Sequence, residues 1–252
     1  MWNPVEPNVG RTRVAPSTAV RFFAAAVIVA ALGGALMATA QPAAASDPNP
    51  GVFPPSSHPY GHSYAKWGKI WWEWALSFPA DINPIVADGD ADEELQPSGP
   101  VWYLAGTFGG SANRTIDVPA DKALLVPLWN FFTWSPEDCW WLGASAAPDG
   151  CTSHEMAAAV DALMADPPAM SASLDGSPFE DLADYRARLA NPFHYFIDGS
   201  GLAGPPDYPV GDRFPTRSDG FYLMLRPLAA GEHTLNFTVG GFLDVTYDLT
   251  VE

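Results

Sequence analysis

The chain has 252 residues, of which 48% are hydrophobic and 13% aromatic, and its formal net charge is −17. This length is enough for one domain with a sizeable buried core. The excess of 29 acidic over 12 basic side chains argues against nucleic acid and anionic membrane surfaces as partners.

Residues 1–45 have the layout of a secretory signal peptide. Three arginines precede an uncharged apolar run over residues 22–40, and small residues lead to a cleavage site after Ala45. Cleavage after Ala40 and an uncleaved membrane anchor are the alternatives. Export leaves residues 46–252 with a formal charge of −19. It predicts a secreted protein of the extracellular space, periplasm or cell envelope, free of the membrane after cleavage.

A proline-rich stretch and a tryptophan-rich stretch begin the exported part. Residues 46–61 hold five prolines, which predicts an extended leader. Residues 62–78 hold four tryptophans and fit an amphipathic helix that Pro79 ends. One stripe of that helix carries Tyr64, Trp67, Ile70, Trp71, Trp74 and Phe78, and the opposite side carries Lys66, Lys69 and Glu73. We expect the aromatic stripe to be buried.

Two strands and a second helix are predicted in the middle of the chain, after a long acidic loop. Residues 101–105 and 123–129 are apolar runs of strand length. Pro127 places the second run at a sheet edge or on a bulge, because proline donates no ladder hydrogen bond. Residues 152–155 match a capping box, which predicts a short helix that ends before Pro167.

Beyond residue 170 the pattern becomes that of β-structure. Hydrophobic alternation over residues 221–225, 233–239 and 243–251 predicts a half-solvated antiparallel sheet. Asp-Gly pairs, which favour tight turns, begin at positions 88, 149, 175, 198 and 219. The predicted fold is a single mainly β domain over residues 62–252. We expect an antiparallel β-sandwich of immunoglobulin or jelly-roll type, with the tryptophan-rich helix packed on it and a second short helix.

Cys139 and Cys151 are the two cysteines of the chain. In an oxidising compartment they predict one disulfide, which would stabilise the fold by about 3 kcal/mol on the chain-entropy model. A reactive thiol or a metal pair is the alternative, although the spacing matches no metal-binding pattern.

Tryptophan is in excess, with ten in the chain. Trp72 lies beside the helical stripe, and Trp134, Trp140 and Trp141 flank the cysteine loop. Exposed aromatic rings near acidic groups stack on sugar rings or on flat apolar ligands, so we expect these four residues to bind ligand. The alternative is that they pack against the edge of the sandwich.

Two histidines and a glutamate are the candidates for catalysis. His58, His62 and Glu73 would serve as metal ligands or as acid and base if the fold brought them together. Ordinary surface histidines and an ion pair between Glu73 and Lys69 are the alternatives. No G-x-S-x-G motif is present to suggest a serine hydrolase.

An acidic cluster is the candidate for a metal site. Asp88, Asp90 and Asp92 have the one-three-five spacing that Ca²⁺ loops use, but the following residues depart from an EF-hand. A solvated acidic turn is the alternative, and no other cofactor is expected.

Four stretches of the exported part carry a resemblance to a known family. They are WWEWA at 71–75, GPVWYLAG at 99–106, LRPLAAGEHTL at 225–235 and LDVTY at 243–247. Together they resemble a family of uncharacterised secreted bacterial proteins, labelled only as signal-peptide proteins, with a tryptophan-rich N-terminal helix and an immunoglobulin-like C-terminal half. The resemblance implies no activity. In the family's pattern a cysteine replaces Ile116 and a glycine replaces Asp121, which implies that a second disulfide is missing here.

The sequence thus predicts a secreted or envelope-associated binding protein, whose ligand is a glycan or a small apolar molecule held by exposed tryptophans. The alternative is an extracellular hydrolase, either metal-assisted or a carboxylate-based glycoside hydrolase. Whether the protein is an enzyme, and its oligomeric state, are left open by the sequence.

Overall fold

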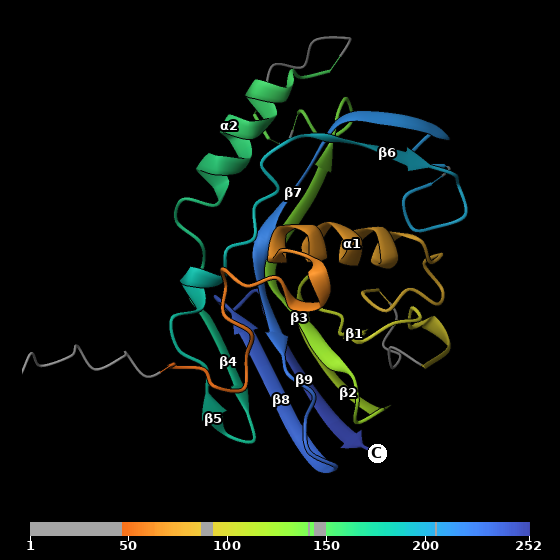
Figure 1. Ribbon diagram of the computed structural model, residues 1–252. Coiled ribbons are helices and arrows are strands. Elements are labelled where there is room, and N and C mark those ends of the chain that lie inside the picture. Colours follow the sequence, from red (N-terminus) through yellow and green to blue (C-terminus); the bar gives the residue numbers. More distant parts are fainter. Residues whose placement is uncertain (1–46, 87–92, 141, 144–149, 205) are drawn as a thin grey trace, which may run out of the picture. The chain divides into compact units, whose positions relative to one another are not determined.

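The computed structural model of the protein describes residues 47–86, 93–140, 142–143, 150–204 and 206–252. Within these residues the chain forms two α-helices and nine strands (Figure 1). The predicted signal peptide, the candidate calcium ligands Asp88, Asp90 and Asp92, and Trp141 lie outside the described residues.

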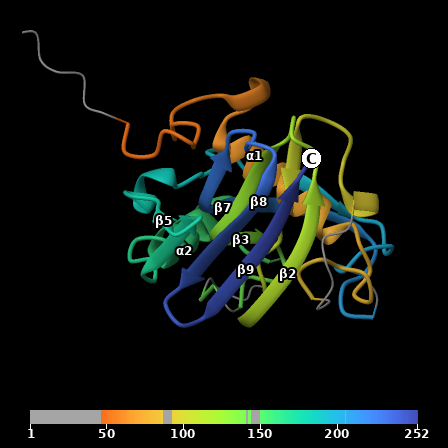
Figure 2. The same ribbon diagram turned by 90° about the horizontal axis from the view of Figure 1, so that it is seen from below.

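The strands of the described residues form two sheets, whose inner apolar faces meet in one core. The four-stranded sheet has the order β1 (Val101–Tyr103), β3 (Ala123–Trp134), β7 (Gly211–Leu225) and β6 (Phe193–Ile197). The five-stranded sheet has the order β2 (Gly110–Val118), β9 (Leu243–Val251), β8 (Gly231–Val239), β4 (Met170–Leu174) and β5 (Ser177–Pro178). Figure 2 shows β2, β9 and β8 side by side. The mainly β, two-sheet architecture is as predicted.

The prediction of antiparallel pairing throughout was wrong for two strand pairs. β1 pairs with β3, and β2 with β9, in parallel. Parallel neighbours need a crossover connection, and here the chain between β1 and β3 passes through β2 in the other sheet. Local alternation contains no information about such distant partners. The immunoglobulin or jelly-roll subtype stays a prediction.

The tryptophan-rich helix is confirmed as α1 (Tyr64–Leu76). The Ser63 hydroxyl caps it by accepting a hydrogen bond from the Lys66 amide. The helix lies across the face formed by β3 and β7 (Figure 1). It approaches β7 closely, because a Cβ at Gly68 would lie 2.8 Å from the Tyr222 ring. Burial extends beyond the predicted stripe to Gly68, Trp72, Ala75 and Leu76.

Strand β3 contains the bulge that Pro127 predicted. Pro127 pairs with Tyr222 and Asn130 with Gly220, so β3 has one more residue in this interval than β7. The extra residue shifts the alternation, and Pro127 and Asn130 therefore face the same side. That side is the one covered by α1, where the rings of Phe132 and Trp72 lie 5.9 Å apart.

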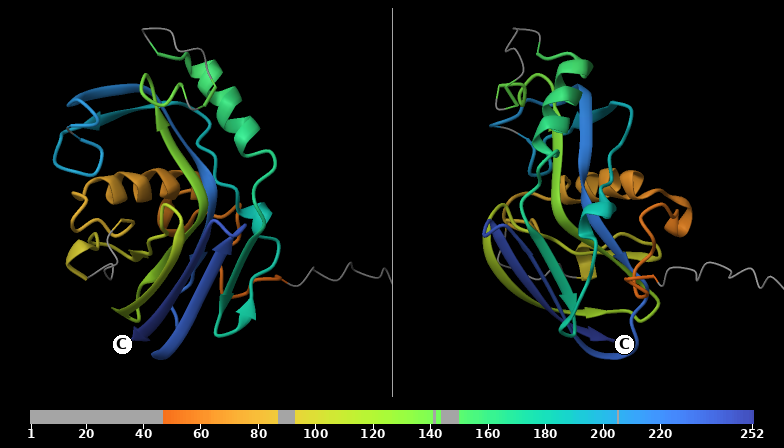
Figure 3. Two further views of the ribbon diagram at one scale, coloured as in Figure 1. Left: turned by 180° about the vertical axis from the view of Figure 1, so that it is seen from behind. Right: turned by 90° about the vertical axis from the view of Figure 1, so that its left-hand side faces the viewer.

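The second predicted helix is α2 (Ser153–Leu163), whose capping box joins Thr152 and Glu155. It lies on the opposite side of β7 from α1 (Figure 3). Arg217 connects β7 to α2, because its Nη2 donates a hydrogen bond to the Ser153 carbonyl at 3.0 Å. The predicted disulfide between Cys139 and Cys151 is present directly before this helix.

The proline-rich segment is packed into the domain and is not extended throughout, because the Val52 amide donates to the Asn49 carbonyl and the Ser57 amide to the Pro54 carbonyl in two turns. Val52 is fully buried and forms a β-bridge with Leu225, while the Phe53 amide donates to the Met224 carbonyl at 2.9 Å. The short 3₁₀ helix η1 (Pro59–Gly61) then leads to α1. Two further 3₁₀ helices are η2 (Glu93–Leu95) and η3 (Leu182–Tyr185).

One Asp-Gly pair forms the predicted tight turn, and another lies inside a strand. Asp175 and Gly176 have φ values of 52° and 75° and form the predicted tight turn between β4 and β5. Asp219 and Gly220 instead lie inside β7. The Asp219 carboxylate is buried there and accepts hydrogen bonds from Arg186. In a turn, water would make those hydrogen bonds instead.

Candidate functional site

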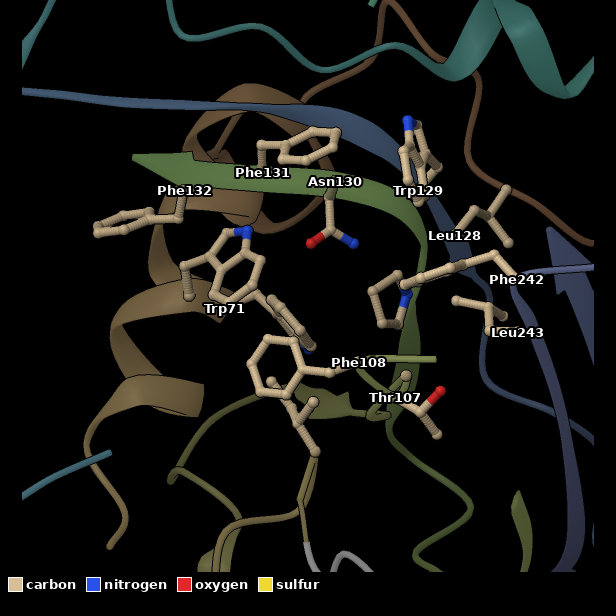
Figure 4. Close-up of a pocket in the computed structure, with 14 residues that line it drawn as sticks. Trp71, Thr107, Phe108, Leu128, Trp129, Asn130, Phe131, Phe132, Phe242 and Leu243 are labelled. Carbon is tan, nitrogen blue, oxygen red and sulfur yellow. The ribbon is translucent and has the colours of Figure 1, made fainter. Parts of the chain in front are cut away.

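A cavity of about 250 Å³ lies between α1, the bulged part of β3 and the ends of two loops (Figure 4). We name it the aromatic cavity, because its lining includes Trp71, Trp72, Phe108, Trp129, Phe131, Phe132 and Phe242. Aliphatic residues such as Ile85, Leu128 and Leu243 complete most of the wall. The polar side chains of the lining are those of Thr107 and Asn130.

Asn130 is the central polar group of the aromatic cavity. Its amide points from β3 into the space between the rings (Figure 4) and makes no hydrogen bond to any described residue. The Thr107 hydroxyl, in contrast, already accepts a hydrogen bond from the Gly109 amide at 3.1 Å. A primary amide that is surrounded by rings can both donate to a ligand and accept from it, and so can orient it.

The local sequence fixes Asn130 in this position. The bulge turns its side chain toward α1, and Gly220 on the neighbouring strand leaves space beside it. A Cβ at Gly220 would lie 2.3 Å from the Asn130 Cβ, so any larger residue would displace one of the two strands.

The rim of the aromatic cavity carries exposed rings. Phe108 is 57% exposed, and Phe242 is exposed too, with its ring 5.6 Å from that of Trp129. Exposed large apolar side chains that gather at one opening are typical of ligand or partner sites. The rim makes this cavity the candidate binding site of the described residues.

A second cavity of about 430 Å³ adjoins the first and shares Trp72, Phe108 and Phe132 with it. We name it the acidic cavity, because its remaining lining includes Asp138, Asp207, Trp134 and Tyr208. The rings of Trp134 and Tyr208 lie 5.2 Å apart, edge to face. Burial raises the pKa of the Tyr208 hydroxyl, and the negative charges of Asp138, Asp207 and Glu137 raise it further.

A buried arginine holds the wall of the aromatic cavity in place. Arg114 of β2 donates from Nη1 to the Ala105 carbonyl and the Tyr247 hydroxyl, and from Nη2 to the Pro84 and Gly106 carbonyls. It has no carboxylate partner among the described residues. Four donated hydrogen bonds compensate for the burial of its charge. Of these acceptors, Gly106 lines the cavity itself and Pro84 directly precedes the lining residue Ile85.

Sequence reasoning missed Arg114 and Asn130 as site residues. Alternation in β2 puts Arg114 on the same inner face as Ile116 and Val118, which was a usable signal. The sequence gives no such signal for Asn130. The direction of its side chain depends on the bulge in β3, which is defined by pairing with β7, about ninety residues later in the chain.

The four predicted ligand-binding tryptophans are distributed differently from the prediction. Trp72 and Trp134 are only 8% and 5% exposed, so the expectation of exposed platforms was wrong for both. They are covered by Phe132, which packs against each ring, but each still lines a cavity. Trp140 is 74% exposed and lines neither cavity.

The structure does not bring the catalytic candidates together. His62 precedes α1 and packs against Trp67, whereas Glu73 lies eleven residues later and pairs with Lys69. Glu73 lies nine residues beyond Tyr64, the first residue of α1, which at about 1.5 Å per residue is about 14 Å along the helix from the end that His62 precedes. His58 is exposed, and the described residues contain no group of three metal-ligating side chains.

Comparisons of the chain with protein-family models, curated proteins and solved structures found no match. In the described part of the chain, no helix has the length and apolar character needed to cross a membrane.

Proposed function

We propose that the protein is a binding protein for a small apolar organic ligand, which occupies the aromatic cavity. The observation that carries this proposal is the lining itself: seven aromatic residues surround one amide that has no hydrogen-bond partner among the described residues. Ligand pockets typically combine such an apolar wall with a few polar groups that fix orientation.

The lining chemistry favours binding over catalysis in this cavity. The described residues that line it include no acidic, basic or cysteine side chain to act as acid, base or nucleophile. A sugar would need several hydrogen-bonding partners for its hydroxyl groups, and the polar groups that the described lining side chains offer are those of Asn130 and Thr107 and the indole N–H groups of the tryptophans, which donate but cannot accept. An apolar ligand therefore fits better than a glycan.

The first test is titration with N-phenyl-1-naphthylamine, a neutral dye that fluoresces in apolar surroundings. Binding should saturate at one dye molecule per chain. A binding free energy of about 0.3 kcal/mol for each non-hydrogen atom of the dye corresponds to a Kd of about 0.2 mM, and we expect that value or a tighter one. Phe108→Ala should weaken binding several-fold, because it removes the more exposed of the two rim rings, Phe108 and Phe242. Phe196→Ala is the matched control, since Phe196 is 60% exposed and lines neither cavity.

The second test fills the cavity without disturbing the fold. Gly106 is buried and lines the aromatic cavity, and a Cβ placed on it would meet no atom within 4 Å. Gly106→Leu should therefore stay folded and lose dye binding. Gly51→Leu, at an exposed glycine with equally open surroundings, should bind the dye normally. Unchanged dye binding in a folded Gly106→Leu protein would contradict the proposed function.

A further inference from the structure

The polar side chains of the aromatic cavity differ in what they can offer a ligand. The indole N–H groups of the wall donate but cannot accept, and that of Trp71 already donates to the Leu104 carbonyl at 2.8 Å. The Thr107 hydroxyl oxygen already accepts from the Gly109 amide. Among the described side chains of the lining, Asn130 therefore provides the one acceptor that makes no hydrogen bond, and its amide donors lie beside that acceptor.

The amide of Asn130 presents an acceptor and a donor together. Its carbonyl oxygen and its amino group both point from β3 into the cavity (Figure 4). They belong to one planar group, so they lie side by side whichever way the amide is turned. The matching partner is a ligand edge with a donor next to an acceptor, as when asparagine pairs with two neighbouring atoms of an adenine edge. A hydroxyl group has its donor and acceptor on one atom and cannot face both amide groups at once.

A ligand that enters the cavity displaces water from this amide. Asn130 is half-buried, and rings from α1, from β3 and from the loop that carries Phe108 surround the space that it faces. A ligand without polar atoms would leave both amide groups without partners, and a ligand that only accepts would leave the carbonyl oxygen without one. The amide therefore selects for a ligand that both donates and accepts.

The rest of the wall favours a flat, neutral ring system next to that polar edge. Trp71, Phe108 and Phe131 contribute aromatic surfaces, on which another ring packs well. The described lining contains no charged side chain, so an ionised ligand would find no partner of opposite charge in it.

We propose that the aromatic cavity binds a neutral, flat aromatic compound with an amide edge, which is a cyclic lactam or a primary carboxamide. The ligand N–H donates to Asn130 Oδ1, and the ligand carbonyl oxygen accepts from Asn130 Nδ2. This inference rests on the proposed function, since it specifies the polar part of the ligand that occupies the same cavity.

Two molecules of nearly equal shape test the donor. They are 2-quinolinone, which is a lactam, and coumarin, in which a ring oxygen replaces the lactam N–H. Each is titrated against the protein with N-phenyl-1-naphthylamine bound, and the loss of dye fluorescence gives its affinity. We expect 2-quinolinone to bind about tenfold tighter than coumarin, because coumarin leaves the Asn130 carbonyl without a donor.

One variant tests the residue. Asn130→Leu keeps nearly the same volume and removes the amide, so 2-quinolinone and coumarin should bind to it with equal affinity. Near-UV circular dichroism shows whether the variant is folded, and its own dye affinity is measured before the competition. Asn113→Leu is the matched control and should keep the tenfold preference, because Asn113 is an exposed strand residue that lines neither cavity.

The outcomes separate this inference from the proposed function. Equal affinity of the two compounds for the wild-type protein would overturn the amide-edge inference and leave the proposed function standing, and so would failure of both to displace a bound dye. A preference for 2-quinolinone that persists in folded Asn130→Leu would overturn the role of Asn130. No binding of either compound, together with no dye binding, would remove both proposals.

Discussion

The position of Asn130 depends on a glycine that is not itself among the residues lining the aromatic cavity. Gly220 lies opposite it on β7, and the bulge after Pro127 determines the direction of the Asn130 side chain. The candidate site is therefore controlled by backbone spacing as much as by its rings. Substitutions at such a position affect binding and stability together.

Gly220→Ala tests this dependence. The new methyl would lie 2.3 Å from the Asn130 Cβ, so the strands must separate. Overpacking of this kind typically costs about 1 to 3 kcal/mol, and dye affinity should fall because Asn130 and its neighbours shift. Urea unfolding and dye titration measure the two effects, with Gly51→Ala as the control. Wild-type stability and binding in Gly220→Ala would contradict this account.

Arg114 is the second residue on which the site depends. Arg114→Lys keeps the charge but has a single nitrogen in place of the two that reach four acceptors. Because buried carbonyls then lose their donors, the free energy of unfolding should fall by about 1 to 3 kcal/mol. Urea unfolding measures this change. The exposed Arg226→Lys should change stability by less than about 0.5 kcal/mol. A similarly small effect at Arg114 would show that its hydrogen bonds are dispensable.

At the scale of elements, regular periodicity was the most informative feature. Helical spacing predicted α1, and strict alternation predicted β9, because each pattern reports directly which side of an element is buried. Trp72 was missed as a buried residue because α1 contacts neighbours on more than one side. The Asp219-Gly220 pair was misread because a local turn signal cannot reveal a cross-strand contact.

The hairpin of β4 and β5 is joined to β8 by an ion pair that should respond to pH. His233 Nδ1 and Asp175 Oδ2 lie 2.7 Å apart. Hydrogen bonding to Asp175 raises the pKa of His233 above 6.5, and hydrogen bonding to His233 lowers the pKa of Asp175 below 3.8. The contribution of the histidine is therefore complete below pH 6.5 and is lost as the pH rises through its raised pKa.

Thermal or urea unfolding between pH 6 and pH 9 checks this expectation. Wild-type protein should lose up to about 1 kcal/mol relative to His233→Gln over that range, as is usual for a partly exposed pair. The aspartate's contribution is present above pH 3.8 and is lost only in stronger acid. His58→Gln should follow the wild-type profile. Parallel profiles for wild type and His233→Gln would show that the pair contributes nothing.

For the whole molecule, the candidate site could be predicted only in its composition. Excess tryptophan indicated an aromatic ligand site, and Trp72 and Trp134 do line the two cavities. The cavities themselves are built where α1, β3 and loops from distant parts of the chain meet. Parallel pairing of β2 with β9 brings two of those parts together, and no local pattern encodes it.

The disulfide connects stability with the acidic cavity. Cys139 follows Asp138 directly, so the bond to Cys151 holds the turn that carries one wall of that cavity. The double substitution Cys139→Ala with Cys151→Ala should lower the free energy of unfolding by about 3 kcal/mol in urea titrations. Dye binding in the aromatic cavity should persist, since α1 and β3 form that cavity without the disulfide. Loss of dye binding in a double variant that remains folded would show that the disulfide also holds the aromatic cavity in place, contrary to this expectation.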